Sequence, residues 1–457
     1  MSSPNSDIQA KLTEGPIGST LLRLTLPMIV GILSMVAFNL VDTYFIGNLG
    51  TRELAAISFT FPVIFVISGL TMGIGIGASA VISRAIGEGN QEKVRRLTTD
   101  SLILGFFITG FFVLLGLLFF HSVFSLLGAD EAMRKLIFDY MKIWMPGMLF
   151  IVIPMVGNNA IRATGDTKTP GMIMLFAVIV NAVLDPLLIF GAGPFPRLGL
   201  AGAAIATVAA RAMTMVIALY VLIHREKMIR FTRPSLKSWF HSWKSILFIG
   251  LPAGATNVII PMGMGILTRM LSGYGPEIVA AFGVGTRIDT FALTVVMALS
   301  TALSPFIGQN LGAGHCHRVR QSIAVSQRFA LIWGFVIAAV LTCLGRTIAQ
   351  CFNPDPTVIH TLRQYLRIVP IGYGMQGVFL ISASSMNVLH RPLQSAGMNL
   401  IRIFGFFIPL AVLGKLAFDY LGIFASAPVT NFCAGLIVFL WLRKFVHDEE
   451  CRLNQSS

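Results

Sequence analysis

The stretch "LPMIVGILSMVAFNLVDTYFIGNLG", residues 26–50, decides the broad class of this protein. Most of it belongs to an apolar run from Leu21 to Ile46, which is longer than the roughly 20 residues that a helix needs to cross about 30 Å of hydrocarbon. Similar runs recur along the whole chain, which is 55% hydrophobic and only 12% charged and has a mean hydropathy of +0.78. Soluble domains carry about a quarter charged residues. The sequence therefore predicts a multi-pass membrane protein.

Hydropathy predicts an all-α fold with twelve transmembrane helices. The predicted spans are 21–46, 55–81, 99–120, 136–160, 171–192, 199–223, 245–271, 279–306, 323–344, 365–388, 397–414 and 421–443. They divide the chain into a flexible cytoplasmic leader (1–20), an N-lobe of six helices (21–223), a cytoplasmic linker (224–244), a C-lobe of six helices (245–443) and a cytoplasmic tail (444–457).

The distribution of basic residues predicts the orientation of the chain. The loops after even-numbered spans hold most of them, for example Lys93, Arg95 and Arg96 in the second loop and six between 224 and 244. By the positive-inside rule these loops and both termini are cytoplasmic, in the inner membrane of the cell. The net charge of +14 is explained in this way, so no nucleic-acid partner is expected. Five scattered cysteines without a CxxC pair predict neither a disulfide framework nor a metal site.

The two halves of the chain are copies of one repeat. A shift of 225 residues aligns Pro27 with Pro252 and Gly89 with Gly314, and a shift of 223 residues aligns Thr207 with Thr430. Six spans per copy is an even number, so both copies enter the membrane in the same direction. Parallel repeats of this kind are a known transporter plan with a substrate site at the repeat interface.

Polar residues that occur in the first copy alone mark a candidate site. A carboxylate at the centre of a membrane costs about 2.5–3.5 kcal/mol even on the more permissive scales, so an unrepeated one indicates a function. The aligned residues of the second copy are apolar: Asp42 aligns with Leu267, Asn181 with Phe404 and Asp185 with Ile408.

These residues are also expected at similar depth. Asp42, Asp185 and Thr207 lie about 8, 10 and 12 Å below the outer surface at 1.5 Å per helical residue. Asn181 and Asp185 are i and i+4 and share a helix face, as do Asn39 and Asp42 at i and i+3. We therefore predict a cation site formed by these five side chains. The structural alternatives are headgroup exposure of the aspartates and interhelical hydrogen bonding by Asn181 and Thr207.

Two prolines are predicted to serve conformational change. Pro186, directly after Asp185, frees a backbone carbonyl, and an interrupted membrane helix usually lines a cavity. Pro27 can bend the first helix and thereby change the exposure of its carboxylate.

Other patterns favour structural roles. Gly69, Gly73 and Gly77 are spaced by four and predict a closely packed helix face rather than a phosphate loop. Arg287 and Asp289 are interpreted as a charge pair, with a second polar site as the alternative.

The residues resemble the MATE (multidrug and toxic compound extrusion) transporters, and among them the DinF-like branch. The resemblance covers nearly the whole chain and is carried by residues 26–50 and by "IGEGN" (86–90), "RATGDTKTP" (162–170), "NAVLDPLLIFG" (181–191), "GLAGAAIATV" (199–208) and "IGQNLGAG" (307–314). It implies two six-helix lobes in a V around a central cavity and cation-coupled export of drug-like compounds.

Carried over by position, the family's N-lobe cation site matches Asp42, Asn181, Asp185 and Thr207. The similar NorM-like branch places acidic residues in helices 7 and 10, whereas "PAGATNVIIPMGMGIL" (252–267) and "PIGYGMQGVFLISASS" (370–385) contain none. This difference favours proton coupling through the N-lobe.

We therefore predict a monomeric antiporter, not an enzyme, that exports amphipathic and often cationic compounds in exchange for protons, without a further cofactor. Burial disfavours the charged form of a carboxyl group, and two neighbouring carboxyl groups titrate as one coupled system. Sodium at the same oxygens is an alternative, as is a flippase for a lipid-linked precursor. An intramembrane aspartyl protease is a further alternative, but no GxGD motif surrounds either aspartate. A channel is the last alternative function, but the two-lobe repeat favours a transporter with alternating access.

Overall fold

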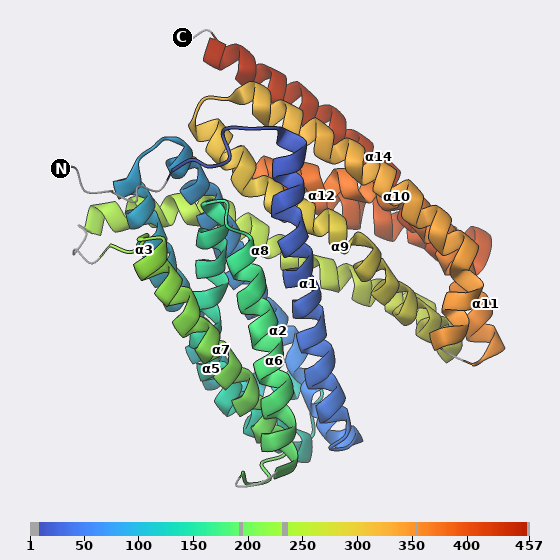
Figure 1. Cartoon of the computed structure of the whole chain (residues 1–457). Helices are drawn as coiled ribbons and strands as arrows, with labels where there is room; N and C mark the ends of the chain where they lie inside the picture. The colour runs from blue at the N-terminus through green and yellow to red at the C-terminus, as the bar shows by residue number, and fades with distance from the viewer. Residues whose placement is uncertain (1–8, 192–194, 231–235, 353, 455–457) are drawn as a thin grey trace. The chain divides into compact units, whose positions relative to one another are not determined.

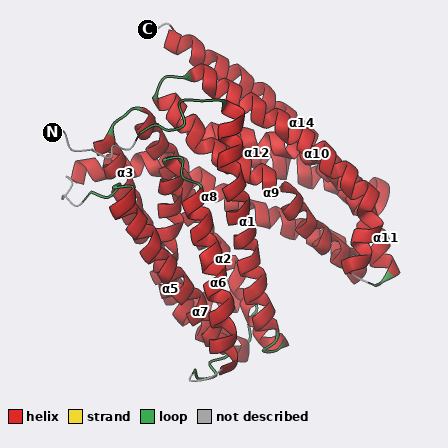
Figure 2. Ribbon diagram, in the orientation of Figure 1, coloured by secondary structure: helices red, strands yellow, loops and turns green. Residues whose placement is uncertain are grey.

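The computed structural model describes residues 9–191, 195–230, 236–352 and 354–454, and the side chains of residue 236 and of residues 445–454 are outside the description. All regular elements among these residues are helices (Figures 1 and 2). Parts of the predicted leader (1–8), linker (231–235, with Arg233) and tail (455–457) lie outside the described residues.

The first half of the chain forms seven α-helices and two short π-helical segments. These are α1 (Ile17–Gly47), α2 (Thr51–Gly87), α3 (Gln91–Leu118), α4 (Phe120–Leu126), α5 (Glu131–Ala163), α6 (Lys168–Pro186), η1 (Leu187–Gly191), α7 (Leu200–Tyr220) and η2 (Val221–Arg225).

The second half forms seven further α-helices with a 3-10 and a π-helical segment between them. These are α8 (Leu236–Ser272), α9 (Pro276–Gly312), α10 (Cys316–Phe352), α11 (Pro356–Ile368), η3 (Val369–Gly372), α12 (Tyr373–Val388), α13 (Pro392–Leu400), η4 (Ile401–Phe407) and α14 (Ile408–Asn454).

The structure confirms the predicted all-α membrane architecture. Eleven helical segments of the described residues are long and apolar enough to cross a membrane. The last one, Pro392–Lys444, contains non-helical backbone at Phe418 and Asp419 and therefore holds the last two of the twelve predicted spans. Most helices are longer than predicted because hydropathy detects only the apolar part of a helix. For example, the predicted span 55–81 lies inside α2.

Several helices begin where a polar side chain can cap them. The carboxylate of Asp130 accepts from the backbone N–H of Met133 at 2.7 Å at the start of α5. Asn90 accepts from the N–H of Lys93 at 2.9 Å at the start of α3. Such caps satisfy amide groups that have no partner inside the helix, and they fix the positions of the loops between membrane helices.

The described chain divides into two compact units. Unit 1 comprises residues 1–11 and 26–254, and unit 2 comprises residues 12–25 and 255–457. The divisions fall inside α1, between Thr25 and Leu26, and inside α8, between Gly254 and Ala255. The helix-interrupting residues Pro27 and Pro252 lie within a few residues of these divisions. The predicted linker boundary at Lys244 lies within α8.

Helix α5 forms the centre of unit 1. It packs against α2, α3 and α7, and its buried residues Met141, Met145 and Met148 lie in the main apolar cluster of the unit. Two prolines, Pro146 and Pro154, lie within this long helix. The surrounding helices therefore have a common packing partner, which fixes α7 relative to α2 and α3.

Helix α12 has the corresponding place in unit 2, where it packs against α9, α10 and α14. Part of the predicted leader also belongs to this unit. The backbone N–H of Leu12 donates to Gln309 Oε1 and the Asn310 amide donates to the Leu12 carbonyl, each at 3.0 Å. The Arg318 side chain donates to the carbonyl of Gly15 at 3.0 Å.

The predicted close-packing glycine face of α2 is confirmed. A Cβ atom added to Gly73 would lie 2.2 Å from the carbonyl oxygen of Gly250, and one added to Gly77 would lie 2.4 Å from that of Ile246. A Cβ atom added to Gly254 would lie 3.2 Å from the carbonyl oxygen of Gly69. The backbone of α8 thus leaves no room for a side chain at Gly73 or Gly77 of α2, and a side chain at Gly254 of α8 would require a small shift of α2.

We expect Gly73→Ala to destabilise the protein because the added methyl group meets backbone atoms, which cannot rotate away as a side chain can. Overpacking of this kind costs about 1–3 kcal/mol. The melting temperature of the detergent-solubilised protein measures the effect. Gly265→Ala on α8 is the control, because a Cβ atom there meets nothing within 4 Å. Equal melting temperatures for the two variants would contradict the assigned contact.

Candidate functional site

Three helices of unit 1 converge around the predicted polar residues. Phe38 of α1, Ala177 of α6 and Ala210 of α7 form a small buried apolar cluster. Close to it, Gly171 approaches α1 so tightly that a Cβ atom there would lie 2.7 Å from the carbonyl oxygen of Pro27. This packing brings the polar residues of α1, α6 and α7 into one region.

Asp185 and Asn181 form the buried part of the site. Both side chains are 0% exposed. The Asn181 amide donates a hydrogen bond to Asp185 Oδ1 at 3.0 Å, as their i, i+4 spacing allows. Asp185 is followed at Pro186 by the change from α6 to the π-helical turn η1, a type of distortion that is frequent at functional sites.

Four side-chain oxygens near this point are buried without a hydrogen-bond partner in the described part of the chain. They are Asp42 Oδ1, Asn181 Oδ1, Asp185 Oδ2 and Thr207 Oγ1. An unpaired buried polar atom costs about 1–3 kcal/mol, and more when it is charged. These four residues are among the five that the sequence predicted to meet, so α1, α6 and α7 each supply at least one unsatisfied oxygen.

The two carboxyl groups of the site act on each other. The charge of Asp42 interacts with that of Asp185, and both interact with the phenol of Tyr140 on α5. Tyr140 is only 3% exposed and belongs to the main core of unit 1. Two carboxylates at this proximity repel each other unless a proton or a metal cation neutralises one of them.

Arg211 is a site residue that the sequence analysis missed. It lies one helical turn after Thr207 on α7, and its charge interacts with that of Asp42. Its guanidinium carbon lies 4.4 Å from the centre of the Phe38 ring, and its Nε is buried without a partner in the described residues. Two features of the sequence could have indicated Arg211: it lies at i+4 from Thr207, and it is an arginine inside an apolar span.

Asn39 does not join the site. Its side chain is exposed, and its amide donates to the Met35 carbonyl of the same helix at 3.0 Å. The i, i+3 spacing to Asp42 places two residues on neighbouring parts of a helix surface, but it does not fix which of them faces the neighbouring helices. The prediction that Asn39 contributes to the cation site therefore has no support from these contacts.

The arrangement can hold a positively charged species. Carboxylate, amide and hydroxyl oxygens suit hard cations such as Na⁺, and a proton on one carboxyl group would supply a hydrogen-bond donor for a neighbouring oxygen. Both species would remove the repulsion between Asp42 and Asp185. The residues present thus fit a coupling ion.

A third membrane carboxylate has a different environment. Asp289 of α9, in unit 2, accepts hydrogen bonds from the phenols of Tyr365, at 2.6 Å, and Tyr373. The described residues include no ion pair between Asp289 and Arg287, so the expected charge pair is wrong. Two tyrosines two turns apart in the sequence supply the partners instead. Both carboxylate oxygens of Asp289 are therefore satisfied, whereas Asp42 and Asp185 each have one oxygen that is buried without a partner among the described residues.

A family model described as MatE matches the chain twice, at residues 27–187 and 252–413. The two matches begin at the repeat-related residues Pro27 and Pro252 and together cover most of the chain. The internal repeat is thereby confirmed at the level of the family.

Relatives cover nearly the full length of the chain. The FAD transporter of Shewanella oneidensis is 40% identical over 428 residues, which is 94% of this chain and 95% of that protein. The probable multidrug resistance protein YpnP of Bacillus subtilis is 27% identical over 438 residues, with coverages of 94% and 96%.

Among solved structures, the Vibrio cholerae MATE transporter VcmN in the bent form matches with a TM-score of 0.90 at 31% identity. The match covers 95% of this chain and 98% of that structure.

The family consists of transporters rather than enzymes, so the protease alternative is set aside. By the double match of the family model, the likeness to full-length relatives and the shared fold, this chain belongs to the MATE family of membrane transporters.

Proposed function

We propose that the protein is a secondary antiporter that exports small amphipathic compounds in exchange for protons. Asp42, Asp185, Asn181 and Thr207 are the proposed coupling site. The observation that supports this proposal best is the pair of interacting carboxyl groups with unpaired buried oxygens in an apolar helical unit. A proton is the smallest species that neutralises such a pair.

The proposed cycle uses the packing of α1. A proton taken up by the Asp42 and Asp185 pair removes their repulsion, so α1 can approach α6 and α7 at that level. The backbones of α1 and α6 already meet at Pro27 and Gly171, and this contact would serve as the pivot. Pro27 provides no N–H for the helix and so weakens α1 at the same point. Loss of the proton restores the repulsion and resets the site.

Sodium is the alternative coupling ion. The unpaired oxygens of Asn181 and Thr207 would contribute to a sodium shell, whereas a proton requires only one carboxyl oxygen. The two ions are distinguished by imposing each gradient separately.

We expect Asp42→Asn and Asp185→Asn each to lower transport driven by a pH gradient to the level of protein-free vesicles, because an amide carries no titrating proton. The initial rate of dye accumulation in inverted vesicles is the measurement, with an imposed pH gradient in one series and an imposed sodium gradient in another. Transport driven by sodium alone would reassign the coupling ion.

Asn39→Ala is the matched control for these variants, because Asn39 lies on the same helix as Asp42 but is exposed. It should transport at the wild-type rate. Full transport by both aspartate variants under the pH gradient would contradict the proposed coupling role.

Thr207 offers a second test, because its buried hydroxyl can be removed with little change of shape. Thr207→Val should lower the rate of coupled transport about tenfold, the equivalent of one hydrogen bond to a charged group. Thr207→Ser keeps the hydroxyl and should retain most of the rate. Equal rates for the two variants would show that the hydroxyl takes no part.

Export of flavin adenine dinucleotide is a second candidate function. The relative named as an FAD transporter is 40% identical to this chain, whereas the relative named as a probable multidrug resistance protein is 27% identical. The cargo could therefore be an anionic dinucleotide rather than a cationic drug. The proposed coupling site is compatible with either cargo, because it concerns the ion alone.

The two cargo classes give opposite results in one experiment. Inverted vesicles that contain the protein are supplied with ethidium or with FAD under the same pH gradient. Under the multidrug proposal we expect saturable, gradient-dependent uptake of ethidium, lost in Asp185→Asn. Saturable uptake of FAD without uptake of ethidium would establish the second candidate instead.

A further inference from the structure

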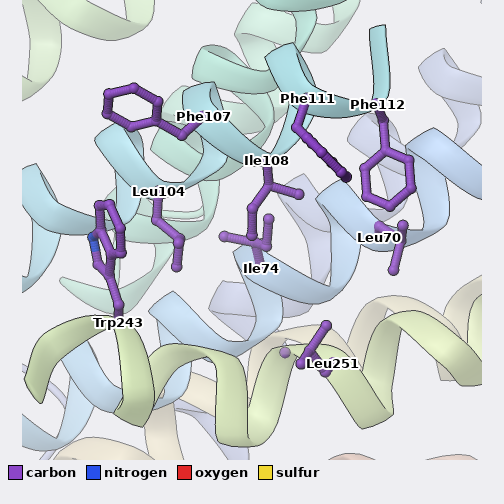
Figure 3. A pocket seen from close by; sticks show the side chains of 10 residues that line it. Leu70, Ile74, Leu104, Phe107, Ile108, Phe111, Phe112, Trp243 and Leu251 are labelled. Carbon is purple, nitrogen blue, oxygen red and sulfur yellow. The ribbon is translucent and has the colours of Figure 1, made fainter. Parts of the chain in front are cut away.

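An apolar groove lies on unit 1 between α2, α3 and α8. It has a volume of about 270 Å³. Its described lining consists almost entirely of apolar side chains. Side chains from α3 and α8 face each other across it, with those of α2 behind (Figure 3). The lining residues that matter below are Phe107, Ile108 and Phe112 of α3 and Trp243 of α8.

A basic cavity adjoins this groove. It has a volume of about 830 Å³, and its lining includes Arg96 of α3 and Lys237, His241 and Lys244 of α8. Trp243 lines both the cavity and the groove, so the two lie on either side of this residue. The basic cavity thus lies next to the apolar groove.

Trp243 is held in place at the junction. Its indole N–H donates to the backbone carbonyl of Asp100 at 3.1 Å, and its ring stacks on that of Trp239 with centroids 5.7 Å apart and planes at 11°. The Phe107 ring lies near the Trp243 ring, with the two centroids 6.2 Å apart. Tryptophan with one polar and one apolar surrounding is typical of the membrane–water boundary. We therefore expect the junction to lie near the boundary between headgroups and hydrocarbon.

The charge of the basic cavity is only partly compensated. Arg96 interacts with the buried carboxylate of Asp100, one helical turn away on α3. Lys237 and Lys244 are exposed and form no ion pair within the described part of the chain. The lining contains no acidic side chain among the residues that the structure describes. The Arg96 Nε is also buried without a hydrogen-bond partner among the described residues.

From these observations we propose that unit 1 holds a binding site for one anionic phospholipid. The phosphate would lie among Arg96, Lys237 and Lys244, and an acyl chain would follow the groove toward Phe112. The distance along α3 from Arg96 to Phe112 is about 24 Å at 1.5 Å per residue, enough for a headgroup and an acyl chain. Basic pockets beside membrane helices bind anionic headgroups in this way.

The ligand class follows from the chemistry of both parts. A soluble phosphate would use the basic cavity but leave the apolar groove unfilled, and a neutral lipid would use the groove but leave the lysines unpaired. An anionic lipid alone satisfies both, because its charge and its hydrocarbon are covalently joined. This site is separate from the polar site of α1, α6 and α7, since none of its lining residues belongs to those helices.

The site has a structural consequence for α8. The same helix presents Gly250 and Gly254 to the glycines of α2 and presents Trp243 and Lys244 to the proposed lipid. A bound lipid would contact α3 and α8 together and so reinforce their association. We therefore expect the lipid to raise the thermal stability of the full-length protein.

The test uses the delipidated, full-length protein in detergent. Binding and melting temperature are measured during titration with phosphatidylglycerol, with phosphatidylcholine of the same acyl chains, and with glycerol phosphate. We expect saturable binding of one phosphatidylglycerol and a higher melting temperature. Phosphatidylcholine should bind at least about tenfold more weakly, because each basic residue near an anionic headgroup contributes several-fold to the affinity.

Variants then test the two parts of the site. Lys237→Gln with Lys244→Gln should weaken phosphatidylglycerol binding about 10- to 30-fold and leave phosphatidylcholine binding unchanged. Ile108→Trp, which fills the groove, should weaken the binding of both lipids. Lys135→Gln with Lys168→Gln is the control, because it removes two exposed lysines elsewhere in unit 1 and should bind phosphatidylglycerol like the wild type.

Three results would overturn the proposal. Equal affinity of the wild type for the two lipids would exclude recognition of the anionic headgroup, and this result requires no variant. Wild-type affinity of the Lys237 and Lys244 variant would exclude the basic cavity. Binding of glycerol phosphate as tight as that of phosphatidylglycerol would show a site for a soluble anion.

Discussion

The mutual repulsion of Asp42 and Asp185 in an apolar helical unit is the constraint on which the rest of the site depends. Water can stabilise a pair of carboxylates, but the surroundings of Asp185 and Asn181 exclude it. Arg211 interacts with the charge of Asp42, and under the proposed function a coupling ion would neutralise the rest of the pair. The unpaired oxygens of Asp42, Asp185, Asn181 and Thr207 are therefore the feature on which the proposed coupling role rests.

The environment of Asp289 shows the opposite solution to the same problem. Its two oxygens are fully occupied by the phenols of Tyr365 and Tyr373, so the carboxylate contributes a fixed connection between α9 and the α11–α12 region. A buried carboxylate with complete hydrogen bonding rigidifies a core, whereas one with free oxygens is available to an ion. Residue type alone does not separate these roles; the partners do.

Helix α8 illustrates how one segment can serve two surroundings. Its glycines allow backbone contact with α2, where a single methyl group would collide with a carbonyl oxygen. Its tryptophan and lysines face the groove and the basic cavity. The close helix contact fixes the position of α8, and this position brings Trp243 opposite Phe107 of α3. Protein packing and the proposed lipid site therefore depend on the same glycine contacts.

The sequence by itself determined the all-α membrane class, the twelve spans, the family and the glycine face, because each depends on apolar length, on repeated residues or on fixed helical spacing. It also selected Asp42, Asp185 and Asn181, since the aligned residues of the second repeat are apolar, and it selected Thr207 by its similar depth in the membrane. Only the tertiary structure decided that Arg211 and Tyr140 join them and that Asn39 does not. The partners of Asp289 and the basic cavity beside Trp243 were likewise beyond the sequence. The physical reason is that spacing fixes neighbours within one helix, whereas contacts between helices depend on how each helix is rotated about its axis.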